Sequence, residues 1–481
     1  MVETDEIDTY RAMQRPVRWR LRPEERRVVL LIGDLVINYF ALFLALYFWA
    51  SSDHWLSFSI QFVKERTDYW FYLLPLFWVL LIIELYDERA ASRRSEIVRG
   101  VAIAAVISLG LYFMLYFSSS PRSLPRRGVA GFIIAASLLT ILWRLIYIRI
   151  FTAPMFMRRV LIIGAGRGGT TLVHVVKEIW PQPFFLVGLI DDCKDKIGAQ
   201  IDGYTVLGDS QKVLSIIEKE HITDLICAIS GEMSPELFQM LLSAEERGIE
   251  VTTMPVIYEE LLRRVPIFLL QSDWILRSFL DQTHTGGFYE MTKRLMDIAG
   301  GLFGVICTII LFPFIALATL IDTGLPIFYL QNRLTRNGKI YRIIKFRTMC
   351  KDAEKDGKAR PASENDSRVT RVGRVLRKSH LDELPQFINV MVGDMSLVGP
   401  RAERPEIIEE LQNKVPFYRA RLLVKPGLTG WAQINYGYAS GAEANAVKLE
   451  YDLYYIKHRN ILLDFTIILR TLGTVVGFRG Q

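Results

Sequence analysis

The stretch RRVLIIGAGRGG, residues 158–169, decides how the centre of the chain folds. Its apolar residues Val160–Ile163 are typical of a buried strand, Gly164, Gly166 and Gly169 follow, and an apolar-periodic helix pattern comes next. Glycines at this spacing permit a tight turn in which backbone amides and a helix N-terminus can meet a pyrophosphate. The stretch therefore predicts a Rossmann-like α/β domain.

The segments that follow continue this alternation of strands and helices. FFLVGLIDD (184–192) predicts a second strand that ends at Asp191, and DLICAIS (224–230) predicts a third strand after an intervening helix. We expect a nucleotide-binding type of domain over residues 158–255, with Asp191 near the ribose of a bound nucleotide. The separation from Gly164 to Asp191 is longer than the usual ~20 residues, so a fold kept only for packing is the alternative.

On the N-terminal side, the chain contains apolar runs of about 20 residues, the length that a helix needs to cross a bilayer. We expect a four-helix transmembrane bundle within 28–150, with spans at 28–50, 68–86, 100–118 and 128–148. Asp34 and Arg144 fall inside these runs but near their edges. We therefore expect both side chains to extend to the membrane interface rather than to mark a transport path.

Basic residues predict the orientation of the bundle. The tail at 1–27 contains seven arginines and the loop at 87–99 contains four basic residues, against two in the loop at 51–67. By the positive-inside rule the tail, the second loop and the domains after the bundle face the cytoplasm. The short third loop, with Arg122, Arg126 and Arg127, favours the opposite orientation and is outweighed.

The overall charge and the cysteines restrict the class of protein. The net charge of +7 suits anionic partners such as phospholipid headgroups or phosphorylated substrates. No zinc-finger spacing or RNA-binding signature is present, so we expect no nucleic-acid partner. The four cysteines are far apart, without a CxxC pair, and are typical of reduced thiols in the cytosol.

A fifth apolar run, 298–321, follows a linker at 256–287 and contains Pro313. If this run crossed the membrane, the basic region after it would lie outside the cell, against the positive-inside rule. A central proline removes a backbone hydrogen bond and bends a helix. We therefore expect a re-entrant helix that breaks at Pro313 and returns to the cytoplasmic side; an ordinary fifth span is the alternative.

The region after this helix is strongly basic. Residues 333–378 contain 15 Lys and Arg against 5 Asp and Glu. Within it, IYRIIKFRTM (340–349) alternates like a strand, which we expect to place Arg342, Lys345 and Arg347 near one another. Arginine binds phosphate through two parallel hydrogen bonds and lysine binds it as a point charge. The region is therefore suited to holding anions.

An acidic pair, Asp382 and Glu383, follows the basic region in a helix–turn–helix pattern. A pocket containing Lys345, Arg377 and Arg401 suits a diphosphate. Beside it, Asp382 can attack phosphorus to form an acyl-phosphate, and Glu383 can hold Mg²⁺. We expect the surrounding cations to keep Asp382 ionised by lowering its pKa.

Three other interpretations compete with this chemistry. In a purely structural one, Ser379 caps a helix whose first turn contains the two acids. In another, a membrane-tethered NAD-dependent enzyme uses the glycine loop with the pair Tyr341 and Lys345. In the third, the four helices belong to a nucleotide-sensing regulatory or transport protein.

Four blocks, in order, carry a resemblance to a known family. They are KFRTM (345–349), LRKSHLDELPQ (376–386), GDMSLVGPR (393–401) and KPGLTGWAQI (425–434). Together they closely resemble the catalytic domain of bacterial polyprenyl-phosphate sugar-1-phosphate transferases, over residues 288–481. With the spans and the middle domain, the whole chain resembles the large monotopic phosphoglycosyl transferases of the undecaprenyl-phosphate galactose or glucose phosphotransferase type.

The resemblance implies a mostly α catalytic domain and a reaction. A hexose-1-phosphate moves from a UDP-sugar to undecaprenyl phosphate, and UMP is released. The reaction uses Mg²⁺ and passes through a covalent aspartyl-phosphosugar intermediate. This is the first membrane step of surface-polysaccharide synthesis at the bacterial inner membrane, and a homodimer is a further expectation. By block position, Asp382 and Glu383 are the catalytic and metal-binding dyad, and the phosphate-binding residues are Lys345, Arg347, Arg377 and Arg401.

Two positions depart from the family pattern. Phe312 precedes Pro313 where the family often has serine, so no hydroxyl is there to bond the freed backbone. Ala402 follows Arg401 where the family has a second proline, which leaves the rigidity of that loop in question. The last apolar segment, 460–478, is interrupted by charges, and we expect it on the membrane surface.

Overall fold

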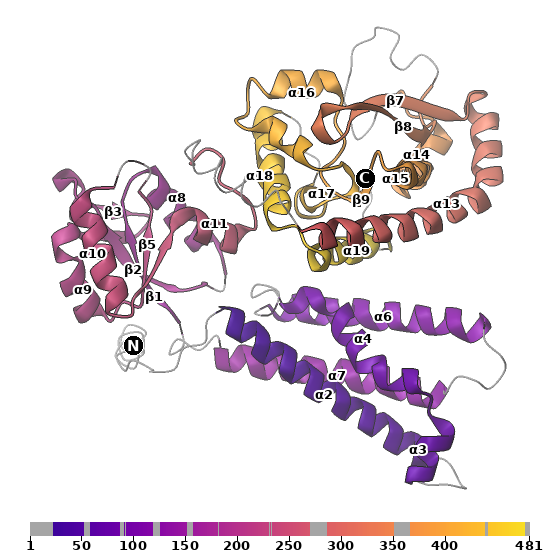
Figure 1. Ribbon diagram of the computed structural model, residues 1–481, viewed down its shortest axis with the longest axis horizontal. Helices are drawn as coiled ribbons and strands as arrows, with labels where there is room; N and C mark the ends of the chain where they lie inside the picture. The colour runs from indigo at the N-terminus through magenta and orange to yellow at the C-terminus, as the bar shows by residue number, and fades with distance from the viewer. Residues whose placement is uncertain are drawn as a thin grey trace. The chain divides into compact units, whose positions relative to one another are not determined.

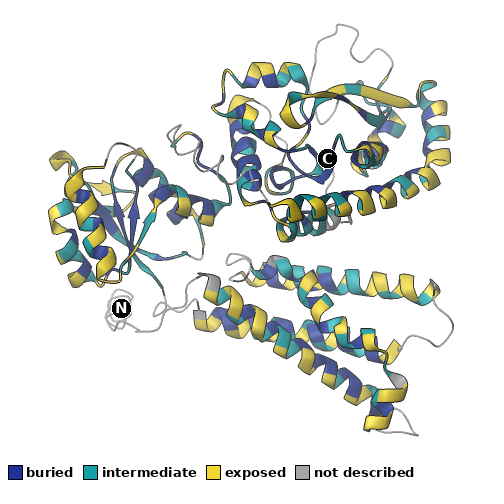
Figure 2. Ribbon diagram, viewed as in Figure 1, coloured by how far each residue is buried: buried dark blue, intermediate teal, exposed yellow. Residues whose placement is uncertain are grey.

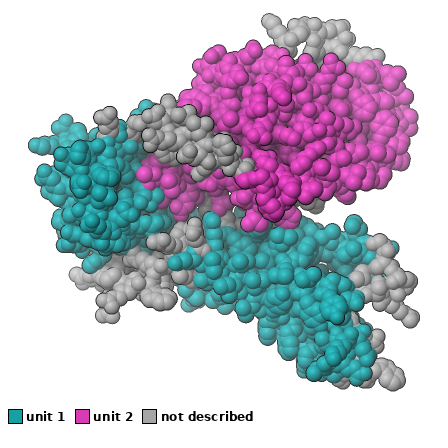
Figure 3. All heavy atoms as spheres, in the orientation of Figure 1, with its two compact units in different colours: residues 1–252 teal, residues 253–481 magenta. Residues whose placement is uncertain are grey.

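The computed structural model describes residues 23–51, 58–86, 91, 93–118, 126–151, 157–180, 182–229, 231, 233–269, 286–350, 366–437 and 441–476. The chain divides into two compact units, Met1–Thr252 and Thr253–Gln481 (Figure 3). Residues 1–22 of the predicted basic tail, Arg122 in the third loop and residues 270–285 of the predicted linker lie outside the described residues.

The N-terminal part of unit 1 is helical (Figure 1). Its long helices are α2 (Pro23–Ser51), α6 (Arg94–Ser118) and α7 (Arg126–Phe151), and a short helix, α3 (Ile60–Arg66), follows α2. Each long helix has the length and apolar composition needed to cross a membrane, and α7 packs against both α2 and α6. The first, third and fourth predicted spans are therefore confirmed as helices of spanning length.

The second apolar run, predicted as one helix over 68–86, is divided into short pieces. A 3₁₀ turn, η1 (Tyr69–Leu73), leads into α4 (Leu74–Leu81), and another, η2 (Ile83–Tyr86), follows. Pro75 lies in the first turn of α4, where its missing amide costs nothing, whereas a helix running through it would lose a hydrogen bond. The prediction of a single spanning helix here is wrong.

Asp34 and Arg144 do not extend to the interface, because both are completely buried. Nη2 of Arg144 lies 2.6 Å from Oδ2 of Asp34, and its Nη1 donates to the carbonyl of Leu85 at 2.7 Å. The guanidinium also lies over the Tyr86 ring, 4.8 Å from the ring centroid. The predicted extension to the interface is wrong because each charge is neutralised by the other, between α2 and α7.

The rest of unit 1 is built on a six-stranded sheet with the order β3-β4-β2-β1-β5-β6. The strands are β1 (Arg159–Ile163), β2 (Phe185–Ile190), β3 (Gln200–Ile201), β4 (Tyr204–Gly208), β5 (Asp224–Cys227) and β6 (Glu250–Thr253). β1 is parallel to β2 and β5, β2 is parallel to β4, and β3 is antiparallel to β4. The three predicted strands are confirmed as β1, β2 and β5.

Helices cover both faces of this sheet. They are α8 (Arg167–Glu178), α9 (Val213–Glu220) and α10 (Pro235–Glu246). Residues of α9 and α10 share one core with strands β1 and β5, and Figure 1 shows α8 on the opposite side. Strands β1, β2 and β5 are mostly buried, shown in dark blue in Figure 2, because helices cover the sheet from both sides, which explains their almost continuous apolar sequences.

Unit 2 contains the fifth apolar run within one long helix. After α11 (Met254–Leu262), α13 (Gly287–Thr323) is a fourth helix long and apolar enough to cross a membrane. Figure 1 shows that α13 changes direction sharply along its length, yet it stays helical on both sides of Pro313. Phe312 stacks on Phe328 and Phe346, with ring centroids 5.7 and 6.3 Å away. The predicted break is thus a continuous helix that bends.

The remaining elements of unit 2 surround a core that includes the buried aromatic residues Tyr418, Trp431 and Tyr455. The helices are α14 (Arg371–Lys378), α15 (Gln386–Val392), α16 (Pro405–Leu411), α17 (Trp431–Asn435), α18 (Ala442–His458) and α19 (Ile461–Val476). The strands form two pairs, β7 (Phe328–Leu334) with β8 (Ile340–Phe346) and β9 (Ser396–Val398) with β10 (Gly427–Thr429). α19, predicted at the membrane surface, is anchored to the core through its buried Asp464 and Ile467.

Candidate active site

Lys345 is positioned by a β-hairpin. β7 and β8 are antiparallel, and the turn between them contains Asn337 and Gly338 in the left-handed region, with φ of 62° and 74°. An Asn-Gly pair favours a hairpin turn of this hand. Side chains alternate along β8, so Lys345 and Arg347 share one face and Arg342 lies on the other. The predicted grouping of Arg342 with Lys345 is therefore wrong.

The acidic pair is positioned by the end of α14. Thr370 caps this helix by accepting from the Gly373 amide at 2.9 Å, and a side chain at Gly373 would clash with the carbonyl of Thr348. His380, with φ of 55°, then turns the chain into the 3₁₀ turn η7 (Leu381–Glu383). Glycine at 373 thus permits α14 to lie close to the end of β8, near the dyad.

This geometry excludes the structural interpretation based on Ser379. The Ser379 hydroxyl donates backward to the Val375 carbonyl at 2.8 Å and closes the C-terminus of α14. Asp382 and Glu383 lie in a 3₁₀ turn and not in the first turn of a helix that Ser379 caps. The structural alternative, with Ser379 as the N-cap, is therefore excluded.

The two carboxylates have different surroundings. Oε1 of Glu383 lies 2.6 Å from Nζ of Lys345, and both side chains are partly exposed. Asp382 is buried, with 7% of its surface exposed. Within the described residues, no hydrogen bond or ion pair engages the Asp382 carboxylate. One acid is therefore paired, and its neighbour is available for chemistry.

The two carboxylates of the dyad also differ in pKa, because their surroundings differ. Burial, and then the charge of Glu383, raise the pKa of Asp382 to about 6, against the opposing effect of Lys345 and Arg377. Burial alone would raise the pKa of Glu383, but Lys345 and then Arg401 hold it at about 2. The predicted lowering of the Asp382 pKa is wrong because burial, together with the charge of Glu383, outweighs the effect of the cations.

The predicted phosphate-binding residues are distributed around this dyad. Arg377 donates from Nε to the Thr348 hydroxyl at 3.0 Å, and its charge acts on Asp382. Arg401 is exposed and acts on Glu383. Nη1 of Arg347 is buried without a hydrogen-bond partner among the residues that the structure describes. Lys345, Arg377 and Arg401 thus contribute charge to one site.

The dyad provides a donor set for a metal ion only together with a substrate. The described residues contain no group of three or more His, Cys, Asp or Glu side chains placed to hold a metal ion. Asp382 and Glu383 nevertheless offer hard carboxylate oxygens side by side. Mg²⁺ is commonly bound by one or two carboxylates plus substrate phosphates, so these residues fit Mg²⁺.

Two of the sequence blocks pack backbone against backbone. GDMSLVGPR contributes β9 and KPGLTGWAQI contributes β10, and the two strands are parallel. A Cβ atom at Gly427 would lie 2.1 Å from the Gly399 amide nitrogen, so only glycine permits this approach. The pairing fixes the chain just before Arg401.

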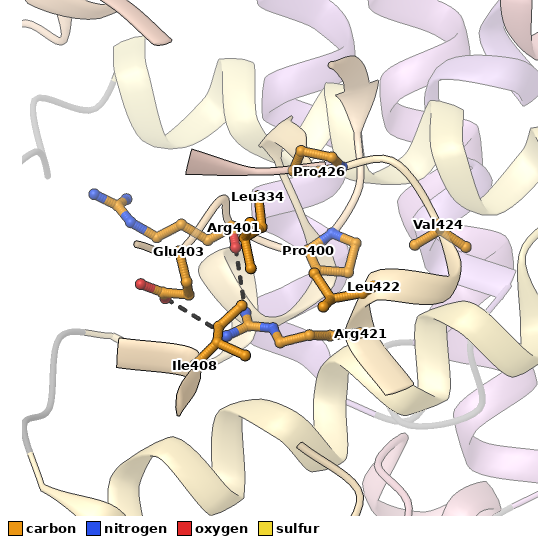
Figure 4. A pocket seen from close by; sticks show the side chains of 9 residues that line it. All are labelled: Leu334, Pro400, Arg401, Glu403, Ile408, Arg421, Leu422, Val424 and Pro426. Atoms are coloured by element: carbon orange, nitrogen blue, oxygen red, sulfur yellow. Dashed lines mark hydrogen bonds and ion pairs between the residues drawn. The ribbon is translucent and has the colours of Figure 1, made fainter. Parts of the chain in front are cut away.

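No distinctive sequence pattern indicates Arg421, a further charged residue of this region. Arg421 is buried and pairs with Asp452 at 2.7 Å, and its neighbours Glu403 and Arg401 line a small pocket with it (Figure 4). Arg421 occurs in an ordinary mixed stretch, YRARLL, without distinctive spacing.

The alternative catalytic pair is not supported by its geometry. Tyr341 and Lys345 are four residues apart on one strand, a separation of roughly 13 Å at ~3.3 Å per residue. Lys345 is held by Glu383. A tyrosine–lysine pair that must act on one substrate atom is therefore not assembled here.

The glycine loop of unit 1 is a tight turn between β1 and α8. Gly164 has φ of +105°, and a Cβ atom at Gly169 would lie 1.9 Å from the Gly164 carbonyl oxygen. The Asp191 carboxylate accepts from the Ala165 amide at 2.7 Å and pairs with Lys196 at 3.1 Å. Gly166, in contrast, faces open space. Asp191 therefore braces the loop itself, and its predicted ribose contact stays a prediction.

Comparison with known proteins identifies the family. The model of the bacterial sugar transferase family matches residues 288–478, and a CoA-binding domain model matches residues 81–255. A sugar transferase of Bacillus subtilis, EpsL, is 37% identical over 188 residues, which cover 39% of this chain and 89% of that protein. The chain belongs to the bacterial sugar transferase family.

Two larger members of the family are also similar. UDP-N-acetylgalactosamine-undecaprenyl-phosphate N-acetylgalactosaminephosphotransferase of Aeromonas hydrophila is 43% identical over 39% of this chain and 44% of its own length. Undecaprenyl-phosphate glucose phosphotransferase of Komagataeibacter xylinus is 29% identical over 66% of this chain and 58% of its own length. The chain spans about half the length of these two sugar transferases.

Proposed function

We propose that this sugar transferase moves a hexose-1-phosphate from a UDP-sugar to undecaprenyl phosphate and releases UMP. The names of the two larger relatives support the lipid acceptor. The observation that carries the proposal is the buried carboxylate of Asp382, on which the charges of Lys345 and Arg377 act. A carboxylate placed in this way can attack an anionic phosphate that the cations hold.

The reaction has two balanced steps. A carboxylate oxygen of Asp382 attacks the phosphorus that bears the sugar, the bond between that phosphorus and the bridging oxygen breaks, and UMP leaves with the electron pair. A phosphate oxygen of undecaprenyl phosphate then attacks the same phosphorus, and the bond to Asp382 breaks. This second step regenerates the carboxylate and yields a lipid-linked sugar diphosphate.

The chain's own residues lower the barrier by holding charge in place. Lys345, Arg377 and Arg401 balance the diphosphate, and Glu383 keeps Lys345 directed at the site. Mg²⁺, if bound by Asp382 and Glu383 with substrate, would neutralise further phosphate charge. With a pKa near 6, Asp382 is mostly ionised at neutral pH and remains a stronger nucleophile than an ordinary aspartate.

The membrane supplies the acceptor, and α13 is the element that meets it in this proposal. Exposed apolar residues line α13 on both sides of Pro313, including Phe303, Ile309 and Phe314. The bend and the basic residues that follow it support a re-entrant helix that enters and leaves on the cytoplasmic side of the bacterial inner membrane. The dyad then lies on the side where UDP-sugars are available.

Labelled donors test the proposal directly. The purified protein is incubated with UDP-glucose or UDP-N-acetylgalactosamine, each labelled in the sugar-bearing phosphate, with and without undecaprenyl phosphate. We expect UMP and labelled lipid with acceptor, and labelled protein without it. Lipid labelling without any protein-bound label under quench conditions would favour direct transfer and contradict the covalent step.

We also propose that the glycine loop of unit 1 binds a nucleotide. The match to a CoA-binding domain and the open space at Gly166 support this. A backbone turn of this kind before a helix suits phosphate groups. Calorimetry with CoA, NAD and UDP on the intact protein tests it, and absence of heat with all three would favour a loop used only for packing.

A further inference from the structure

The segment that carries Arg401 is held by its backbone at four consecutive carbonyls. Two of these carbonyls accept from backbone amides: Pro400 from Gly427 at 2.9 Å and Glu403 from Leu334 at 3.2 Å. The other two accept from guanidinium groups: Arg401 from Nη2 of Arg421 at 3.4 Å and Ala402 from Nη1 of Arg333 at 2.9 Å. The donors belong to three other elements of the catalytic unit. These bonds supply the rigidity that a second proline at position 402 would otherwise provide.

Arg421, in the 3₁₀ turn η8 (Tyr418–Leu423), contributes the side chain at the centre of this arrangement. It is buried, and it donates to the Tyr418 hydroxyl and to Oδ2 of Asp452, both at 2.7 Å. Glu403 lies 3.6 Å from its Nη1. Burial opposes its charge, but Asp452 and these neighbours more than compensate and raise the pKa of Arg421 above its usual range. Arg421 is therefore a charged, fixed donor.

The two arginines divide the work between backbone and side chain. Figure 4 shows Arg421 bonded to the backbone of the segment, while the guanidinium of Arg401 extends away from it. The Arg401 side chain is exposed, and its charge reaches Glu383 of the dyad. A guanidinium on a long side chain binds phosphate best when its backbone does not move.

We propose that Arg421, aimed by Asp452, is a positioning residue that fixes the backbone at Arg401 so that the Arg401 guanidinium meets the diphosphate of the UDP-sugar. The proposal rests on the proposed transferase function. It assigns to Arg421 no contact with substrate. All of its effect on the reaction must therefore pass through Arg401.

Lysine at position 421 separates this role from charge alone. Lys keeps the positive charge, but its single nitrogen cannot bond Asp452, Tyr418 and the Arg401 carbonyl in the fixed fork of a guanidinium. We expect Arg421→Lys to lower kcat/KM for the UDP-sugar by about 10- to 100-fold, as does Arg401→Ala. Asp452→Asn, which leaves Arg421 in place but less firmly aimed, should give a smaller loss in the same direction.

The decisive experiment is a double-mutant cycle on the full-length protein. UMP release is measured with UDP-glucose or UDP-N-acetylgalactosamine, whichever is turned over, for Arg421→Lys, Arg401→Ala and the double variant. We expect Arg421→Lys to cost little once Arg401 is absent, because its only route to the substrate has gone. Arg459→Lys is the matched control, since Arg459 is another buried arginine of this unit, 3.6 Å from Glu290, and its effect should simply multiply.

The outcomes distinguish the two levels of the proposal. If the unmodified protein releases UMP but Arg421→Lys costs the same factor with and without Arg401, the positioning role is refuted and Arg421 is only structural. If Arg421→Lys denatures, the cycle is run with Asp452→Asn, where the same non-additivity is expected and its absence is equally fatal. If the unmodified protein releases no UMP from either donor, the proposed function itself fails.

Discussion

Two buried aspartates of this molecule, Asp34 and Asp382, differ in whether a basic side chain is paired with them. Asp34, in the helical part of unit 1, is completely buried and is bound directly by Arg144 at 2.6 Å. Asp382, in unit 2, is nearly as buried, but no described residue forms an ion pair with it, and Lys345 is bound to Glu383 instead. The Asp34–Arg144 pair, called the closed pair below, contributes to the assembly of the helices. The unpaired Asp382, called the open carboxylate below, remains able to react. The following changes test that contrast.

The largest effect is expected at the open carboxylate. Asp382→Asn keeps the size of the side chain but cannot form the acyl-phosphate, so turnover should fall by about 10⁴-fold or more and the protein-bound label should disappear. UMP release and protein labelling are measured together. Glu410→Gln, at a surface acid paired with Lys414, is the control and should behave like the unmodified protein. An Asp382→Asn protein that still acquires label would refute the assigned nucleophile.

The closed pair should respond in stability and not in chemistry. Arg144→Met leaves the Asp34 charge buried without a partner, and we expect a loss of about 3–5 kcal/mol of stability. Removing both charges, with Asp34→Leu added, should recover most of that loss. Thermal unfolding in detergent measures the two variants. Equal destabilisation of the single and double variants would mean that the pair has a role beyond mutual neutralisation.

The residues around the open carboxylate could be predicted from the sequence, whereas the closed pair could not. Lys345, Arg377 and the dyad lie in blocks whose residue types and order carry the chemistry, and the structure places their charges together. Asp34 and Arg144 are 110 residues apart, and no local pattern can pair them. The prediction of a lowered Asp382 pKa is wrong for a related reason. Cations near an acid can be counted in a sequence, but its burial and the partner that each cation chooses depend on tertiary packing.

The same limit applies to backbone contacts. Gly427 was visible as part of a block, but its contact with Gly399 needs the pairing of β9 with β10. Arg421 donates to the main-chain carbonyl of Arg401. Every residue type has such a carbonyl, so the sequence does not indicate this contact. Pro75, by contrast, could have been recognised from the sequence as a residue at which the second apolar run would not continue as one helix.

The pH dependence sharpens the contrast within the dyad. Attack requires ionised Asp382, so kcat/KM for the UDP-sugar should fall as the pH drops below about 6. Glu383→Gln removes the like charge that raises the pKa of Asp382, and the acid limb of the residual activity should move to lower pH. Lys345→Met removes an opposing cation and should move it to higher pH. Limbs that stay fixed in both variants would mean that another group controls the acid side.

The smallest effect on catalysis is expected in the glycine loop of unit 1, where a new charge is added far in sequence from the dyad. Gly166 faces open space, so Gly166→Asp can be accommodated without a clash, whereas Gly169→Ala would drive a methyl group into the Gly164 carbonyl. Gly166→Asp should therefore fold normally and repel a nucleotide phosphate from the loop. If unit 1 serves structure or regulation, UMP release should stay close to the unmodified value, because residue 166 takes no part in the chemistry. Gly169→Ala is the control for damage to the fold and should lower the unfolding temperature. A thousandfold loss of UMP release in a normally folded Gly166→Asp protein would mean that unit 1 takes part in the reaction. Unit 1 could then no longer be regarded as only structural or regulatory.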